Sequence, residues 1–186
     1  MLGRVIAPGL LGAVVLILWT FLLNGVFGFK SRMDMKAVPD ERAVHEFLRA
    51  HIVEPGGYAC NPALTSAGRF PDSDPVYSIR YSGLGHGAAG REMLVGLLGF
   101  IVAPVIGAWM LSGASEKVLA SYPRKVLFFV ALGVLVALVA DLPRYGIGGY
   151  GMISTLLFMA YDLAAWTLVG LVVAWRMRPS VRVAAR

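Results

Sequence analysis

The chain has 186 residues, of which 58% are hydrophobic and 15% charged, and its formal net charge is +6. A soluble domain has about 45–50% apolar and about 25% charged residues, so this composition argues against a purely soluble protein. The single cysteine, Cys60, excludes an intrachain disulfide, a C-x-x-C redox pair and a c-type haem site.

The apolar residues fall into four blocks, each long enough to cross a hydrocarbon core, which takes roughly 17–25 residues. The blocks run from about Val5 to Phe27, Met93 to Leu111, Val126 to Leu142, and Thr155 to Trp175. The first block is longer than the apolar region of a signal peptide, so we expect a retained anchor within residues 1–27. The pattern predicts an all-α membrane protein with a four-transmembrane-helix bundle.

The segment 28–92, between the first two blocks, has the pattern of a small folded domain. Pro39-Asp40-Glu41 opens a helix in which apolar residues recur at helical spacing. Tyr58–Cys60 and Val76–Tyr81 read as short strands, separated by a segment rich in Pro, Asp and Ser. We therefore predict an α+β domain. A chain of about 60 residues makes only a marginal core by itself, so this domain is expected to lean on the membrane helices or on a partner.

The second block, within the predicted helical region 93–175, contains a stripe of small residues. Gly99, Ala103 and Gly107 recur every four residues and so share one helix face. Such spacing lets another helix approach closely in a membrane. We interpret the stripe as a helix-packing face within the protein.

Basic residues in the short connections predict the orientation. One side holds Arg4, Lys117, Arg124, Lys125, Arg176, Arg178, Arg182 and Arg186, whereas the opposite short loop holds Arg144. The positive-inside rule places both termini in the cytoplasm, with a basic cytoplasmic tail at 176–186 and an extracytoplasmic, periplasmic segment at 28–92. The same basic residues suit the headgroups of membrane lipids. The sequence has no basic helix and no zinc-finger spacing, so it does not indicate a nucleic-acid partner.

Four polar residues stand out because they fall in the extracytoplasmic half of the predicted bundle: Asn24, Asp141, Arg144 and Asp162. Asp162 lies well inside the fourth block, where a carboxylate costs a few kcal/mol unless it is paired, protonated or hydrated. One interpretation is a functional site, with a proton-linked carboxylate or an anchor for a small polar ligand. The other is structural, with an ion pair or hydrogen-bond network that locks the third and fourth helices together.

Candidate metal ligands do not fall into a ligand pattern. They are His45, His51, His86, Cys60, Asp72 and Asp74. His45 and His51 are six residues apart and face different sides of a helix, and Asp72 and Asp74 belong to a turn. We expect neither a metal nor a cofactor, and we find no catalytic motif that would predict an enzyme.

Three stretches carry a resemblance. They are Lys125–Tyr150 around Val139-Ala140-Asp141-Leu142-Pro143, then Tyr161-Asp162-Leu163 followed by Trp166, and the Pro39–Leu48 helix. With these stretches the chain resembles a group of small bacterial four-helix integral membrane proteins. The resemblance implies a bacterial envelope location, and with the predicted spans we expect the bacterial cytoplasmic (inner) membrane. It implies no activity and no site residues.

The sequence leaves three functional hypotheses open. The first is a non-catalytic accessory or scaffolding subunit of a larger membrane protein complex, with other membrane subunits as partners. The second is a small transporter or channel in which Asp162 is the coupling or gating group. The third is a membrane enzyme acting on a lipid or quinone through Asp141 and Asp162.

Overall fold

The computed structural model describes residues 2–145 and 149–177 and divides the chain into two compact units. Residues 1–35 and 92–186 form one unit, here called the membrane unit, and residues 36–91 form the α3–hairpin unit. The predicted domain 28–92 contains the second unit, but its first residues belong to the membrane unit. Most of the predicted basic tail, residues 178–186, and residues 146–148 of the loop before the fourth span lie outside the described residues.

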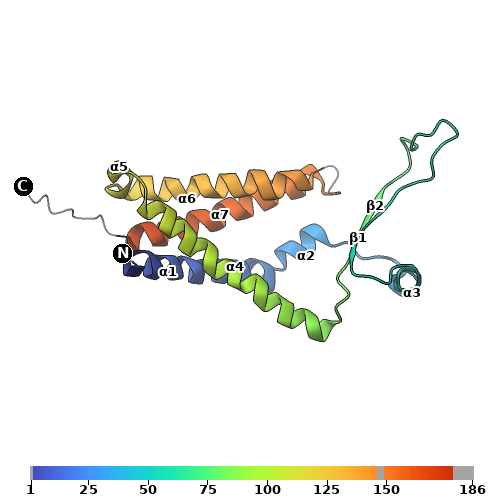
Figure 1. Cartoon of the computed structure of the whole chain (residues 1–186), viewed down its shortest axis with the longest axis horizontal. Helices are drawn as coiled ribbons and strands as arrows, with labels where there is room; N and C mark the ends of the chain where they lie inside the picture. The colour runs from blue at the N-terminus through green and yellow to red at the C-terminus, as the bar shows by residue number, and fades with distance from the viewer. Residues whose placement is uncertain (1, 146–148, 178–186) are drawn as a thin grey trace, which may run out of the picture. The chain divides into compact units, whose positions relative to one another are not determined.

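The described part of the membrane unit contains four helices long and apolar enough to cross a membrane (Figure 1). The spans are Gly3–Val26, Met93–Ser112, Tyr122–Arg144 and Met152–Arg176. This confirms the predicted number of apolar helices. The first span consists of α1 (Leu2–Thr20) and the π-helical η1 (Phe21–Val26), followed by the short α2 (Phe29–Asp34). The second lies in α4 (His86–Ser112), and the short α5 (Glu116–Leu119) follows it.

The third span changes its winding before it ends. It consists of α6 (Tyr122–Val136), the π-helical η2 (Ala137–Asp141) and the 3₁₀-helical η3 (Leu142–Arg144), and the fourth span is α7 (Met152–Arg176). Pro143, which lacks a backbone N–H, lies within η3. The two π-helical segments lie at the same end of the bundle and contain Asn24 and Asp141. We call this the Asp141 end and the opposite one the Lys125 end.

The core of the membrane unit lies where α6 and α7 meet, with α1 and part of α4 against them. Phe129 of α6 and Val169 of α7 are fully buried. Phe129 can pack closely against α7 because position 170 is a glycine. A Cβ atom at that position would lie 2.5 Å from the Cβ of Phe129. Gly9 allows α1 to cross α4 closely, since its Cβ would lie 2.6 Å from the Cα of Val105. Small residues thus set the helix approaches, as is common in membranes.

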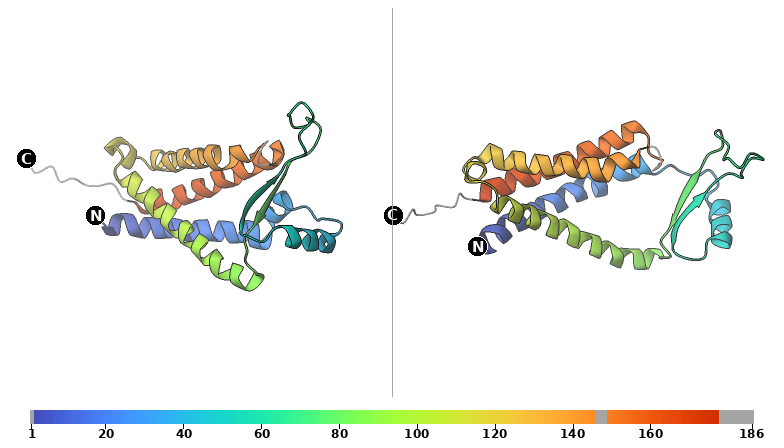
Figure 2. Two further views of the ribbon diagram at one scale, coloured as in Figure 1. Left: turned by 45° about the vertical axis from the view of Figure 1, so that its right-hand side comes forward. Right: turned by 45° about the horizontal axis from the view of Figure 1, so that its top comes forward.

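The half of α4 nearer the Asp141 end diverges from the other helices of the unit (Figure 1), and Figure 2 shows the same divergence in two further views. Met93 is 75% exposed and Leu98 is 59% exposed. The predicted stripe of small residues is therefore packed against the chain at one end and open at the other. Gly107 packs against the Phe129 ring, whereas a Cβ at Gly99 would meet nothing within 4 Å. Ala103, between them, is half-buried.

The α3–hairpin unit has the helix and the two strands that the sequence predicts. α3 (Glu41–His51) begins after Asp40, whose carboxylate accepts a hydrogen bond from the Ala43 backbone N–H at 3.1 Å. β1 (Gly56–Cys60) and β2 (Tyr77–Tyr81) pair antiparallel, with Tyr58 opposite Ile79. Among the side chains described in this unit, none is fully buried. That agrees with the marginal core expected for its length.

Candidate functional site

Asp141 is the most deeply buried acid that the structure describes. It ends η2 and is 2% exposed. Its Oδ1 lies 3.6 Å from Nε of Arg144, one turn further along the chain. A buried carboxylate with a cation on one oxygen still has a second oxygen to satisfy, and Oδ2 of Asp141 has no donor among the described residues unless the neighbouring Asp162 carboxyl group carries a proton.

Asp162 approaches the same place from α7. Its half-buried side chain interacts with the Asp141 carboxyl group and with the charges of Lys30 and Arg144. Charges from the third span and from the flank of the first span therefore act on Asp162 in the fourth. Lys30 comes from α2. Lys30 is not among the predicted site residues, because it lies in the segment assigned to the extracytoplasmic domain.

Asn24 joins this end of the bundle through a tyrosine. Its Nδ2 donates a hydrogen bond to Tyr161 Oη at 3.1 Å, and Tyr161 Oη donates to Thr20 Oγ1 at 3.3 Å. These bonds connect the first span to the fourth. Tyr161 and Thr20 were not predicted as site residues, although Tyr161 is adjacent to Asp162 in the sequence. No periodic signal in a single sequence marks a tyrosine as a hydrogen-bond partner for a residue on another helix.

Aromatic rings pack beside the charged groups. Phe29 stacks on Tyr161, with ring centroids 5.4 Å apart, and meets Phe158 edge to face at 5.7 Å. The Arg144 guanidinium carbon lies 5.2 Å from the Phe158 ring centroid, within cation–π range. The rings lower the local polarity, which strengthens the electrostatic interactions of the charged groups.

Several further polar atoms at this end are buried without a partner among the described residues. Together with Asp141 Oδ2 they are Trp19 Nε1, Asn24 Oδ1 and Thr155 Oγ1. Each unsatisfied buried group costs about 1–3 kcal/mol. The three oxygens can accept hydrogen bonds, so the arrangement has the chemistry to take a proton or a small hydrogen-bond donor.

The expected four-residue polar cluster is thus only partly one cluster. Asp141, Arg144 and Asp162 come together, whereas Asn24 bonds to Tyr161. The Asp141–Arg144 ion pair lies within the third span, so it does not itself lock the third helix to the fourth. In the described ranges, no three His, Cys, Asp or Glu side chains are grouped as a metal site would require.

Comparisons with protein-family models, with curated proteins and with solved structures found no match to this chain. The resemblance to small bacterial four-helix membrane proteins therefore stays a prediction.

Proposed function

We propose that this protein is a non-catalytic accessory or scaffolding subunit of a larger complex in a bacterial cytoplasmic membrane. One observation carries the proposal: the half of α4 nearer the Asp141 end has little packing within its own chain. Met93 and Leu98 are exposed there, and the space beside Gly96 and Gly99 is open. The proposed occupant is a transmembrane helix of another subunit.

The chemistry of α4 favours a helix over lipid alone at this face. Lipid covers apolar side chains well, but glycine in a helix interior costs about 1 kcal/mol relative to alanine. Glycines are useful in a membrane where another helix approaches closely. Gly107 already serves this purpose inside the chain, against Phe129. Gly99 lies two turns away on the same stripe and offers the same opportunity to a partner.

The remaining features fit this proposal. The α3–hairpin unit has no fully buried side chain among those described, so a partner would cover apolar surface there too. The basic connections support a cytoplasmic Lys125 end and an extracytoplasmic α3–hairpin unit. A partner would then contact the protein both in the membrane and outside it.

Native affinity purification with a Gly99→Leu variant tests the proposal. A Cβ atom at this position would meet nothing within 4 Å inside the chain, so the fold is expected to survive a leucine there while the partner helix is displaced. Gly3→Leu is the matched control, since Gly3 is also open and lies on another helix. We expect wild type and Gly3→Leu to co-purify a larger complex and Gly99→Leu to lose it. Free monomer from gently solubilised wild-type membranes would contradict the proposal.

A second candidate function is a small transporter or channel, favoured by the meeting of Asp141 and Asp162. Two neighbouring carboxyl groups, one paired with Arg144 and one influenced by the charge of Lys30, form a site whose charge changes when a proton or cation binds. Asp162→Asn would abolish any flux that depends on this site. Asp72→Asn, in the α3–hairpin unit, is the control. Unchanged proton and ion fluxes in Asp162→Asn proteoliposomes would eliminate this candidate.

A further inference from the structure

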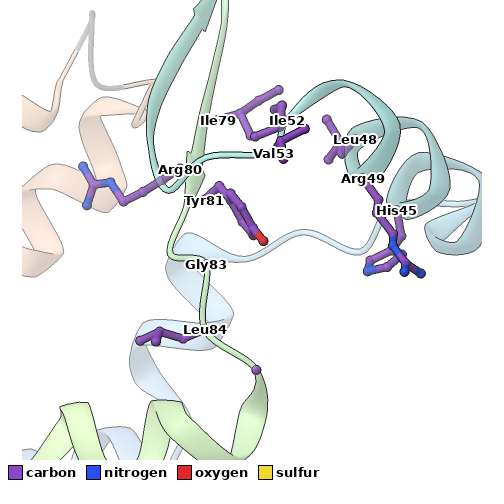
Figure 3. A pocket seen from close by; sticks show the side chains of 11 residues that line it. His45, Leu48, Arg49, Ile52, Val53, Ile79, Arg80, Tyr81, Gly83 and Leu84 are labelled. Atoms are coloured by element: carbon purple, nitrogen blue, oxygen red, sulfur yellow. The ribbon is translucent and has the colours of Figure 1, made fainter.

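A hollow of about 630 Å³ lies inside the α3–hairpin unit, between α3 and the hairpin (Figure 3). This volume is within the range of about 300–1,000 Å³ that is typical of small-ligand sites. All of its lining residues belong to this unit, so the hollow does not depend on the membrane unit. The polar cluster described above plays no part in it.

The floor of the hollow is apolar. Leu48 and Ile52 are four residues apart and share a face of α3. Ile79 faces them from β2, whereas the neighbouring Arg80 points to the opposite side of the hairpin, as strand alternation requires (Figure 3). Leu48, Ile52 and Ile79 are each only half-buried. Covering them would remove apolar surface from water, worth about 25 cal/mol per Å².

One end of the hollow is cationic. His45 and Arg49 are also four residues apart on α3, and Figure 3 shows their side chains next to each other at the edge of the hollow. The nearby Glu46 is paired with Arg42 at 3.1 Å. Neither His45 nor Arg49 has an ion pair or side-chain hydrogen bond with a described residue. Arg49 can therefore bind a carboxylate, and the His45 imidazole can add a hydrogen bond.

We propose that this hollow binds a single-chain anionic amphiphile drawn from the bilayer, of the long-chain fatty-acid type. The carboxylate binds Arg49 and His45, and the alkyl chain lies along Leu48, Ile52 and Ile79. The site has one charged end and an apolar floor, which matches an amphiphile better than a sugar or a nucleotide. The chain continues from both ends of this unit into the membrane unit, and for this reason we take the bilayer as the source of the amphiphile. This inference does not depend on the proposed function.

The experiment uses the full-length protein in phosphatidylcholine nanodiscs and a long-chain fatty acid that carries a photoreactive diazirine. Cross-linked peptides are mapped by mass spectrometry, which separates binding at the hollow from partitioning beside the spans. We expect labelling of the segments Leu48–Val53 and Ile79–Leu84. A diazirine alcohol of the same chain length is the comparison, because it lacks the charge that Arg49 would bind.

Variants at the charged end decide the outcome. His45→Gln/Arg49→Gln is expected to lower labelling of these segments about tenfold, as for loss of a charge-assisted hydrogen bond. Arg49→Lys should retain most of the labelling, and Arg69→Gln, outside the hollow, should retain all of it. Both substituted positions are exposed, so the fold is expected to be unaffected. Labelling confined to the spans, equal labelling by the alcohol, or no effect of the double variant would each overturn the proposal.

Discussion

Lys125 is a buried lysine whose ammonium group caps the C-terminal end of a helix. It is 5% exposed, and its Nζ donates a hydrogen bond to the Met177 carbonyl oxygen at 2.7 Å. Met177 caps the C-terminus of α7, where carbonyl groups lack intrahelical partners and the helix dipole is negative. A cation at this position stabilises the end of α7 and ties it to the start of α6.

Lys125→Met is therefore expected to destabilise the protein. The substitution keeps the apolar stem and removes the donor, leaving the Met177 carbonyl unsatisfied at a cost of about 1–3 kcal/mol. Unfolding in mixed detergent with increasing dodecyl sulfate measures the change. Lys117→Met, at an exposed position in α5, is the control and should leave the midpoint unchanged. Equal midpoints for the two variants would show that the hydrogen bond adds nothing.

The Asp141–Arg144 ion pair makes a second prediction at the residue scale. Arg144→Gln leaves the buried Asp141 charge without this partner, so we expect a loss of about 1–3 kcal/mol. Asp141→Asn/Arg144→Gln should recover part of the loss, because the uncompensated charge is gone. A double-mutant cycle of unfolding free energies measures this coupling. Additive single effects would indicate that the pair does not interact.

At the scale of elements, close helix approach depends on individual glycines. α6 and α7 meet where Gly170 faces Phe129, and α1 and α4 cross at Gly9. The π-helical segments η1 and η2 are a second local feature that shapes the bundle. Each widens the turn near a polar residue, Asn24 in η1 and Asp141 in η2. The Lys125 end of the bundle is thus closely packed, and the Asp141 end combines irregular winding with polar groups.

Gly170→Ala tests the α6–α7 approach. The new methyl group would lie 2.5 Å from the Phe129 Cβ, so the helices must separate. Overpacking of this kind costs about 1–3 kcal/mol. Gly99→Ala has open space and should keep or slightly raise the unfolding midpoint, because alanine favours helix. A Gly170→Ala protein as stable as wild type would contradict the packing described here.

At the scale of the whole molecule, the orientation can be measured with the protein's own cysteine. Cys60 is exposed in β1 of the α3–hairpin unit. If this unit is extracytoplasmic, a membrane-impermeant thiol reagent should label Cys60 in intact spheroplasts. The control variant Cys60→Ser/Ser115→Cys carries its thiol between α4 and α5, and should react only after the membrane is broken. The reverse pattern would invert the predicted topology.

The residues of the candidate site differ in how far their role can be predicted from the sequence. Asp162 and Asp141 were identified because a charge inside an apolar block is a local anomaly. Lys30 and Tyr161 were missed because each is unremarkable in its own segment and acquires its role only from a residue on another helix. The stripe of Gly99, Ala103 and Gly107 was identified by spacing alone. Spacing does not tell which part of a helix stays packed against its own chain.

The sequence by itself determined the four apolar helices, the helix after Pro39 and the two strands of the hairpin. Hydropathy, periodicity and capping are local properties of neighbouring residues, so they can be read without knowing the fold. Only the tertiary structure decided that Gly170 lies against Phe129, that the charge of Lys30 acts on Asp162, and that α4 diverges at Gly99. Each of these features depends on residues far apart in the chain. Helix rotation and tilt determine them, and no local pattern encodes rotation or tilt.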